Sequence, residues 1–150
     1  MQPRELSSRN RGRSTRAKGN QRSRLILVVD DDADIRHAVR SVLEDEGYQT
    51  LEASNGREAL DLLRRAEVKP VLTLLDLMMP TMDGWQLRAR LREDPTLAEI
   101  PIVIMTGHAG VLRAVTNVQS SVLVLAKPLD LGKLLDLAVI YCGEKSPSVH

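Results

Sequence analysis

The sequence VLTLLDLMMPTMDGW, residues 71–85, contains the pattern that decides the fold. It opens with an apolar run, Val71 to Leu75, typical of a strand that is buried on both faces. The run ends in Asp76, and Pro80 and Asp83-Gly84 are then signals for a turn and a helix start. Taken alone, Asp76 is better explained as a solvated strand end. In open parallel sheets, however, ligands bind at this carboxyl end of the strands.

Four further apolar runs also predict strands, at residues 25–29, 48–53, 100–105 and 122–126. Between the runs, apolar residues recur at the spacing of a helix face. The helices expected from these patterns lie around residues 35–43, 59–66, 83–93, 110–118 and 130–141. Strands that alternate with helices in this way predict an α/β fold, with a parallel sheet, right-handed crossovers and helices on both faces.

The charge of the chain is divided unevenly. Residues 1–24 hold eight Lys or Arg and one Glu, whereas residues 25–150 hold thirteen Lys or Arg and nineteen Asp or Glu. We expect residues 1–24 to be a disordered basic tail, because they can bury too little apolar surface to offset their ordering entropy. The tail could attract nucleic acid or an anionic membrane, but it lacks aromatic residues for base stacking, and a solvated leader is the simpler explanation. Residues 143–150 are expected to fray.

Composition disfavours several other classes of protein. The single cysteine, Cys142, allows neither an intrachain disulfide nor a cysteine-based structural metal site. No apolar run reaches the roughly 18–20 residues of a membrane span, and the N-terminus lacks the apolar core of a signal peptide. We therefore expect a cytoplasmic protein with one domain, over residues 25–142.

Reactive side chains follow four of the five expected strands. They are Asp30 and Asp31 after the first, Asp76 after the third, Thr106 after the fourth and Lys127 after the fifth. Because parallel strands place their carboxyl ends along one edge, these side chains should meet there. The second strand supplies none, as expected for an edge strand.

Carboxylates gathered in this way repel one another unless a cation lies between them, and Mg²⁺ is the natural candidate. Lys127 and Thr106 could hold the oxygens of a phosphoryl group. An aspartate can itself accept such a group. Asp76, alone on the central strand, is the best acceptor, whereas Asp30 and Asp31, adjacent on one loop, are better metal ligands.

Four segments of the chain, in this order and at this spacing, resemble the receiver domain of two-component response regulators, of the single-domain, chemotaxis-regulator-like type. They are LILVVDDD (25–32), LLDLMMPTMDG (74–84), IVIMTG (102–107) and LAKPLD (125–130). The resemblance implies a flavodoxin-like (βα)5 fold with strand order 2-1-3-4-5. It also implies that the peptide bond before Pro128 is cis.

The resemblance implies a role for each residue at the strand ends. Asp76 would accept a phosphoryl group from a phosphohistidine on a sensor histidine kinase or histidine phosphotransfer protein. A magnesium ion would be held by Asp30, Asp31, Asp76 and the backbone carbonyl of Met78. The phosphoryl group would be bound by Thr106 and Lys127. Intrinsic self-phosphorylation and self-dephosphorylation would be weak, so the protein would not be an enzyme.

The expected output is through protein partners. About nine residues follow Tyr141, too few for a DNA-binding module, so we expect a downstream protein or a phosphorelay to read the signal. Dimerisation could use the face formed by the fourth helix, fifth strand and fifth helix. Phosphorylation would draw Thr106 and Lys127 inward and shift the loops behind them.

Two departures from the family pattern bear on this output. Val124 stands where the family usually has an aromatic switch residue, and Gln119-Ser120-Ser121 replaces the usual Gly-rich lead-in to the fifth strand. They predict a weaker coupling to the usual output face, or a signal that is read elsewhere. One alternative is thus a binding module that does not use phosphorylation. Another is an aspartyl-phosphate hydrolase of the haloacid-dehalogenase type, but this would need an aspartate where Met78 stands.

Overall fold

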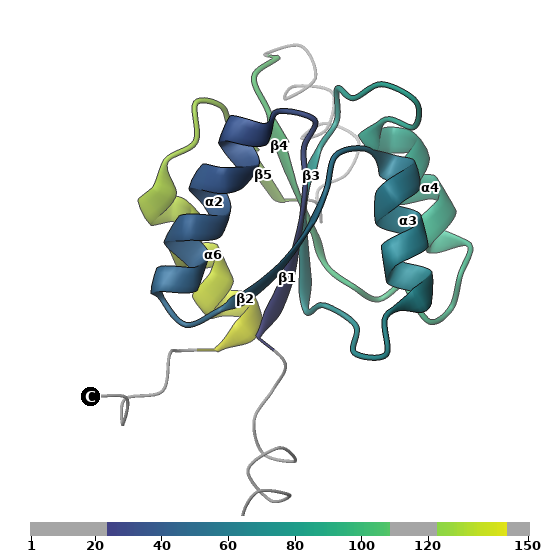
Figure 1. Ribbon diagram of the computed structural model, residues 1–150, viewed down its shortest axis with the longest axis horizontal. Helices are drawn as coiled ribbons and strands as arrows, with labels where there is room; N and C mark the ends of the chain where they lie inside the picture. The colour runs from purple at the N-terminus through teal and green to yellow at the C-terminus, as the bar shows by residue number, and fades with distance from the viewer. Residues whose placement is uncertain (1–23, 109–122, 144–150) are drawn as a thin grey trace, which may run out of the picture.

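A parallel sheet of five strands runs through the middle of the protein (Figure 1). The computed structural model describes residues 24–108 and 123–143. All four neighbouring strand pairs are parallel, in the order β2-β1-β3-β4-β5, which confirms the predicted flavodoxin-like order. The strands are β1 (Leu25–Val29), β2 (Gln49–Ala53), β3 (Leu72–Asp76), β4 (Ile102–Thr106) and β5 (Leu123–Ala126).

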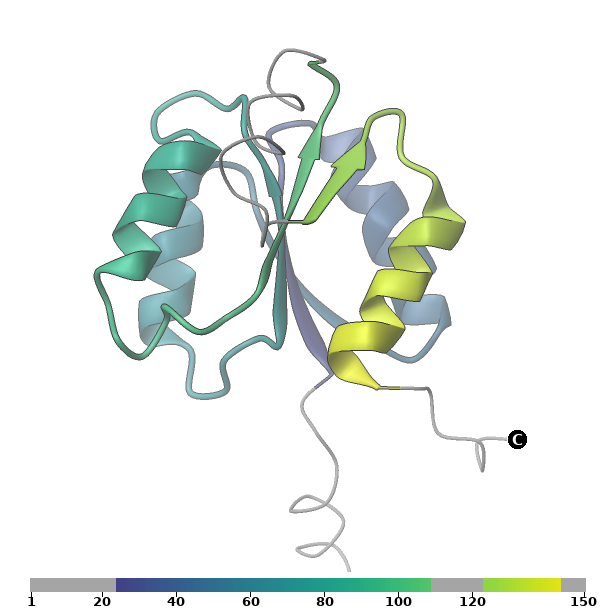
Figure 2. The ribbon, with the colours of Figure 1, turned by 180° about the vertical axis from the view of Figure 1, so that it is seen from behind.

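Helices cover both faces of the sheet, as predicted (Figures 1 and 2). One face carries α2 (Ala33–Asp45) and α6 (Leu131–Cys142), and the other carries α3 (Gly56–Arg65) and α4 (Gly84–Arg92). The helix expected at 110–118, the segment 119–121, the tail up to residue 23 and residues 144–150 lie outside the described residues. None of the helices in the described part is long and apolar enough to cross a membrane.

The strands are apolar on both sides because a core lies on each face of the sheet. In β1, Ile26 and Val28 belong to the core with α2 and α6, whereas Leu27 and Val29 belong to the core with α3 and α4. All of β3 is buried. Since each fully buried side chain of this kind contributes about 1.5–3 kcal/mol, the two cores hold β1 and β3 firmly in register.

Each helix in the described part begins after an Asp or Asn that caps its N-terminus. Asp32, for example, accepts hydrogen bonds from the amides of Asp34 and Ile35 at 2.9 and 3.3 Å. Asp32 is thus a helix cap, which explains why it stands apart from the acidic residues at the sheet edge. The other caps are Asn55 for α3, Asp83 for α4 and Asp130 for α6.

Two strands end one residue later than the apolar pattern predicted. The prediction ended the third strand at Leu75 and the fourth at Met105, but Asp76 and Thr106 are still paired, with Met105 and Ala126. The backbone ladder continues past the point where the side chains become polar. As a result, Asp76 and Thr106 start from strand positions, whereas Asp30, Asp31 and Lys127 follow the ends of β1 and β5.

Helix α4 lies directly against the backbone that carries Asp76. A Cβ atom at Gly84, the first residue of α4, would lie 2.5 Å from the carbonyl oxygen of Asp76 and 2.8 Å from the Cα of Leu77. Both atoms are backbone and cannot turn away. Gly84 is therefore required for this close approach.

We predict that Gly84→Ala lowers the free energy of unfolding by about 1–3 kcal/mol, because the added methyl group forces α4 away from β3. Urea denaturation measures the change. Gly132→Ala in α6 is the control, because its nearest neighbour is the end of the Asp130 side chain at 3.3 Å; it should change stability by less than about 1 kcal/mol. Equal stability of Gly84→Ala and the unaltered protein would contradict the packing described here.

Candidate functional site

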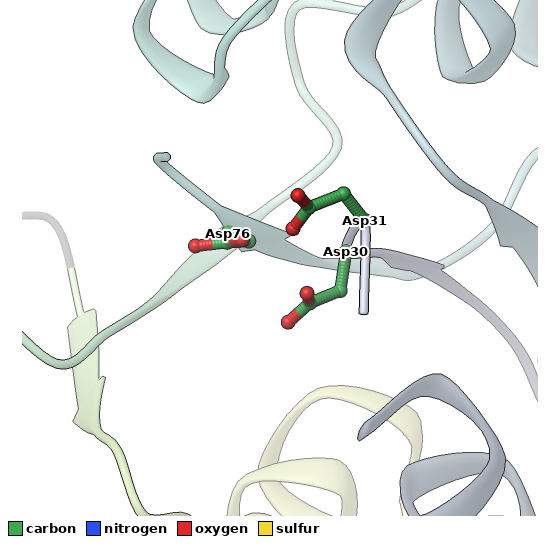
Figure 3. Close-up of side chains that lie close together, drawn as sticks. All are labelled: Asp30, Asp31 and Asp76. Carbon is green, nitrogen blue, oxygen red and sulfur yellow. The ribbon is translucent and has the colours of Figure 1, made fainter. Parts of the chain in front are cut away.

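The register of the sheet brings Asp30 and Asp76 side by side. In the β1–β3 ladder Val29 is paired with Leu75, so the next residue of each strand is an aspartate. Each of Asp30, Asp31 and Asp76 places a carboxylate oxygen within 4.8 Å of the other two. Figure 3 shows the carboxylates of Asp30 and Asp31 pointing toward the side on which Asp76 lies. The three acidic residues expected at this edge therefore do meet.

The three carboxylates differ in their surroundings. Asp30 is fully buried, and its two oxygens accept hydrogen bonds from the amide of Asp32 at 2.9 Å and from Lys127 at 2.8 Å. Asp31 is exposed. Asp76 is buried, and its Oδ1 accepts a hydrogen bond from the amide of Met78 at 3.2 Å. Within the described part of the chain, Oδ2 of Asp76 accepts no hydrogen bond.

Lys127 brings a positive charge to the acidic residues from the end of β5. Its Nζ lies 2.8 Å from Oδ2 of Asp30 and 3.6 Å from Oδ1 of Asp76. Its own amide donates to the carbonyl of Thr106 at 2.9 Å, which holds the start of the β5–α6 loop against β4. The Lys127–Pro128 peptide bond is cis, as the family resemblance implied.

Thr106 and Met78 flank the acidic residues. Thr106 is buried one residue beyond Met105, the partner of Asp76 in the β3–β4 ladder, and its hydroxyl accepts a hydrogen bond from the amide of His108 at 3.2 Å. The hydroxyl makes no hydrogen bond to the three aspartates. The side chain of Met78 is exposed, and its amide donates to Asp76. Both residues lie at the sheet edge where the sequence placed them.

The crowding of charge shifts the protonation equilibria of the site. Burial, and after it the charge of Asp30, raises the pKa of Asp76 to about 6, although the Met78 amide and Lys127 oppose the shift. Burial acts to lower the pKa of Lys127, but its hydrogen bond to Asp30 and the charges of Asp30 and Asp76 outweigh this and raise it. One lysine thus compensates only part of the repulsion among the aspartates.

These features fit a hard divalent cation. All the side chains that meet here, apart from Lys127, offer oxygen atoms, and the raised pKa of Asp76 shows that further positive charge would be favourable. Mg²⁺ uses a few carboxylates, keeps several waters and accepts phosphate oxygens. The arrangement can therefore bind a cation and a phosphoryl group together.

The structure also reveals two residues that the sequence patterns did not single out. Arg36, in the first turn of α2, donates from Nη1 to the carbonyl oxygen of Asp30 at 2.7 Å and from Nε to Glu52 at 3.2 Å. Glu52 lies near the end of β2, the strand that supplies no residue to the acidic cluster. No sequence pattern links Arg36 with Glu52; only their position, each next to the carboxyl end of a strand, could have suggested it.

Comparison with known proteins agrees with this geometry. The family model for the response regulator receiver domain matches residues 26–139. Sporulation initiation phosphotransferase F of Bacillus subtilis is 34% identical over 122 residues, which cover 81% of this chain and 95% of that protein. The probable transcriptional regulator ycf27 of Porphyra purpurea is 38% identical over 100 residues, which cover 67% of this chain but only 39% of the longer relative.

A solved structure supports the same assignment. The response regulator receiver protein of Pseudomonas putida superposes with a TM-score of 0.69 at 33% identity, covering 77% of this chain and 95% of that one. The fold, the strand order and the match over most of the described residues lead to one conclusion. The chain belongs to the response regulator receiver domain family, whose members are phosphorylated on an aspartate in two-component signalling.

Proposed function

We propose that this receiver domain takes its phosphoryl group on Asp76. The observation that carries the proposal is that the three carboxylates differ in how many of their oxygens already accept hydrogen bonds. Both oxygens of Asp30 are already hydrogen bonded, to Asp32 and Lys127, and Asp31 is exposed. Asp76 keeps Oδ2 without a hydrogen bond in the described part of the chain, while Lys127 lies 3.6 Å from its other oxygen. It is therefore the carboxylate best placed to attack a phosphorus atom.

The transfer is a simple displacement. Oδ2 of Asp76 attacks the phosphorus of a phosphohistidine, a P–O bond forms, and the P–N bond to the imidazole breaks as that nitrogen takes a proton. Lys127 would move its charge from Asp30 toward the new phosphoryl oxygens, and the hydroxyl of Thr106 would turn from His108 to donate to another. The buried strand ends would hold the backbone in place during the transfer, so that the side chains of Lys127 and Thr106 do the moving.

A magnesium site completes the proposal. Asp30, Asp31, Asp76 and the backbone carbonyl of Met78 would hold Mg²⁺. The ion would neutralise the repulsion among the carboxylates and draw a phosphoryl oxygen toward Asp76. Asp30 and Asp31 would contribute ligands from adjacent positions directly after β1, and the β1–β3 register brings them beside Asp76.

The donor would be a histidine kinase or a histidine phosphotransfer protein, and the signal would pass to a downstream protein or along a phosphorelay. The name of the B. subtilis relative, a phosphotransferase of sporulation initiation, supports a relay function for a chain of this kind. Intrinsic turnover would be slow, as the family resemblance implies. Hydrolysis of the haloacid-dehalogenase type is disfavoured because Met78 cannot act as a general acid.

One observation favours a second candidate, a binding module that works without phosphorylation. Val124, on β5, packs with Ile104 and Leu77, where an aromatic switch residue would be expected. A valine has too little reach to swing between an inward and an outward position, so phosphorylation could occur without the usual change on the β5 side. The two candidates differ in whether Asp76 takes a phosphoryl group at all.

We predict that acetyl phosphate with Mg²⁺ gives a retarded band in Phos-tag electrophoresis, and that Asp76→Asn or omission of Mg²⁺ abolishes it. The amide of Asn lacks the charge and nucleophilicity of the carboxylate. Asp94→Asn is a matched control, because Asp94 is a half-buried aspartate beyond the C-terminal end of α4, away from the acidic cluster, where its carboxylate accepts hydrogen bonds from Thr96. No band under conditions that label another receiver would favour the phosphorylation-independent module.

We further predict that Asp76→Asn stabilises the metal-free protein in a pH-dependent way. The pKa of Asp76 is about 6 in the folded state and about 3.9 in an unfolded chain. The unfolded state therefore loses its proton first, and the stability of the unaltered protein falls as pH rises from about 4 through 6. The gain from Asp76→Asn should be about 2–3 kcal/mol at pH 7.5 and should shrink toward zero near pH 4.

Urea denaturation in EDTA at several pH values measures this gain. Saturating Mg²⁺ should remove most of it by stabilising the unaltered protein selectively. A gain in the free energy of unfolding that is the same at all pH values would mean that the pKa of Asp76 is not raised in the folded protein.

A further inference from the structure

The peptide group that joins the two adjacent aspartates is held from outside the acidic cluster. Its oxygen, the carbonyl of Asp30, accepts the 2.7 Å hydrogen bond from Nη1 of Arg36. Rotation of this peptide would change the direction of the Asp31 side chain relative to that of Asp30. A hydrogen bond from a charged donor is stronger than one from a neutral donor, so this contact resists such rotation.

The local fold explains why a side chain is needed at this point. The amide of Asp30 donates to the carbonyl of Ala53 at 3.1 Å, and β2 ends at that residue. Beyond it, the backbone turns away to Asn55, the cap of α3. The carbonyl of Asp30 has lost its neighbouring strand, and Arg36 donates in its place. Helix side chains lean toward the helix N-terminus, which brings the guanidinium back over the end of β1.

Arg36 is itself held by an ion pair. Its Nε lies 3.2 Å from Oε1 of Glu52, and both side chains are largely buried, with 17% and 22% exposed. Glu52 also pairs with Arg40 at 2.8 Å. Hydrogen bonds from Arg40 and Arg36 hold the pKa of Glu52 below its ordinary value, so its charge persists. The guanidinium thus uses two of its nitrogens in a fixed fork, which a lysine cannot reproduce.

We propose that Arg36 is a positioning residue for the cation site: anchored by Glu52, it fixes the Asp30–Asp31 peptide so that both carboxylates face Asp76. The proposal rests on the proposed function, because it assumes that Asp30 and Asp31 bind Mg²⁺. Glu52 acts through Arg36 and touches none of the three aspartates. Strand β2 therefore does serve the site, although it supplies no ligand.

Electrostatics and positioning predict opposite effects of removing Arg36. By Coulomb's law, loss of a positive charge near a cation site should strengthen Mg²⁺ binding. Loss of the hydrogen bond to the Asp30 carbonyl should instead weaken it, because the ligands are no longer oriented before the ion arrives. The direction of the change in affinity therefore separates the two causes.

Arg40 provides a matched control on the same helix. It lies one turn beyond Arg36, carries the same charge and binds the same Glu52 as well as Glu44. It makes no contact with the Asp30–Asp31 peptide. Arg40→Met removes one charge and one Glu52 partner, but leaves the bond to the Asp30 carbonyl in place.

The test is isothermal titration of the full chain with Mg²⁺, without any phosphodonor. We expect Arg36→Met to weaken Mg²⁺ binding about tenfold or more, and Arg36→Lys not to restore it. Arg40→Met should bind Mg²⁺ as tightly as the unaltered protein or more tightly. Glu52→Ala alone should also weaken Mg²⁺ binding. The double variant Arg36→Met/Glu52→Ala should bind Mg²⁺ little more weakly than Arg36→Met alone, because both changes release the same fork.

The controls separate failure of this inference from failure of the proposed function. If the unaltered protein binds no Mg²⁺, or if Asp31→Asn does not weaken its binding, the magnesium site itself is wrong. If the unaltered protein binds Mg²⁺ and Arg36→Met binds it equally or more tightly, only the positioning role is overturned. Equal weakening by Arg40→Met would also overturn it. If circular dichroism shows that Arg36→Met does not fold, Arg36→Lys decides the question, because it keeps the positive charge but cannot form the fork: Mg²⁺ binding as tight as in the unaltered protein would overturn the positioning role.

Discussion

The repulsion among three carboxylates at the ends of β1 and β3 is the constraint on which the rest of this structure depends. The aspartates cannot move apart, because the apolar residues on both faces of the two strands hold them in register. Burial then raises the pKa of Asp76 to about 6, and the charge of Asp30 adds to the shift. The stability of the cores thus maintains an arrangement that is unfavourable by itself and that a cation would relieve.

Lys127 compensates the charges of the two buried carboxylates unequally. Its ammonium group lies closer to Asp30 than to Asp76, at 2.8 against 3.6 Å. The lysine therefore neutralises the most buried carboxylate, and within the described residues Oδ2 of Asp76 accepts no hydrogen bond. A phosphoryl group on Asp76 would offer the lysine a new partner, and its movement would pull on the β5–α6 loop. That loop and α2 line a hollow of about 240 Å³ beside Lys127 and Pro128, so a shift of the lysine would alter the surface there.

Much of the fold and the site could be predicted from the sequence, because both depend on local patterns. Apolar runs that alternate with helical periodicity predict a parallel α/β fold, and the resemblance to the family then implies the strand order. The polar residue after each run marks the carboxyl edge of the sheet. Strand ends were less well predicted: Asp76 and Thr106 are polar, yet the backbone ladder still includes them. Asp32 follows two aspartates of the cluster, but its carboxylate caps α2.

The contacts that support the site were not predictable in the same way. The bond from Arg36 to the Asp30 carbonyl and the ion pair of Arg36 with Glu52 join α2, β2 and the loop after β1. Neither residue stands in a periodic pattern or at a turn signal. Arg36 and Glu52 meet because the end of β2, at Ala53, lies close to the start of α2, at Ala33, in the folded protein. Their separation along the chain does not reveal this proximity.

The proposed function depends on a covalent bond between the phosphoryl group and Asp76. The most direct measurement is mass spectrometry after phosphorylation with acetyl phosphate and Mg²⁺ and reduction with borohydride, which converts an aspartyl phosphate into homoserine. We predict a single conversion, at position 76. Conversion at Asp30 or Asp31 would contradict the assignment of Asp76 as the acceptor. So would a lack of conversion in a protein that binds Mg²⁺, under conditions that convert another receiver.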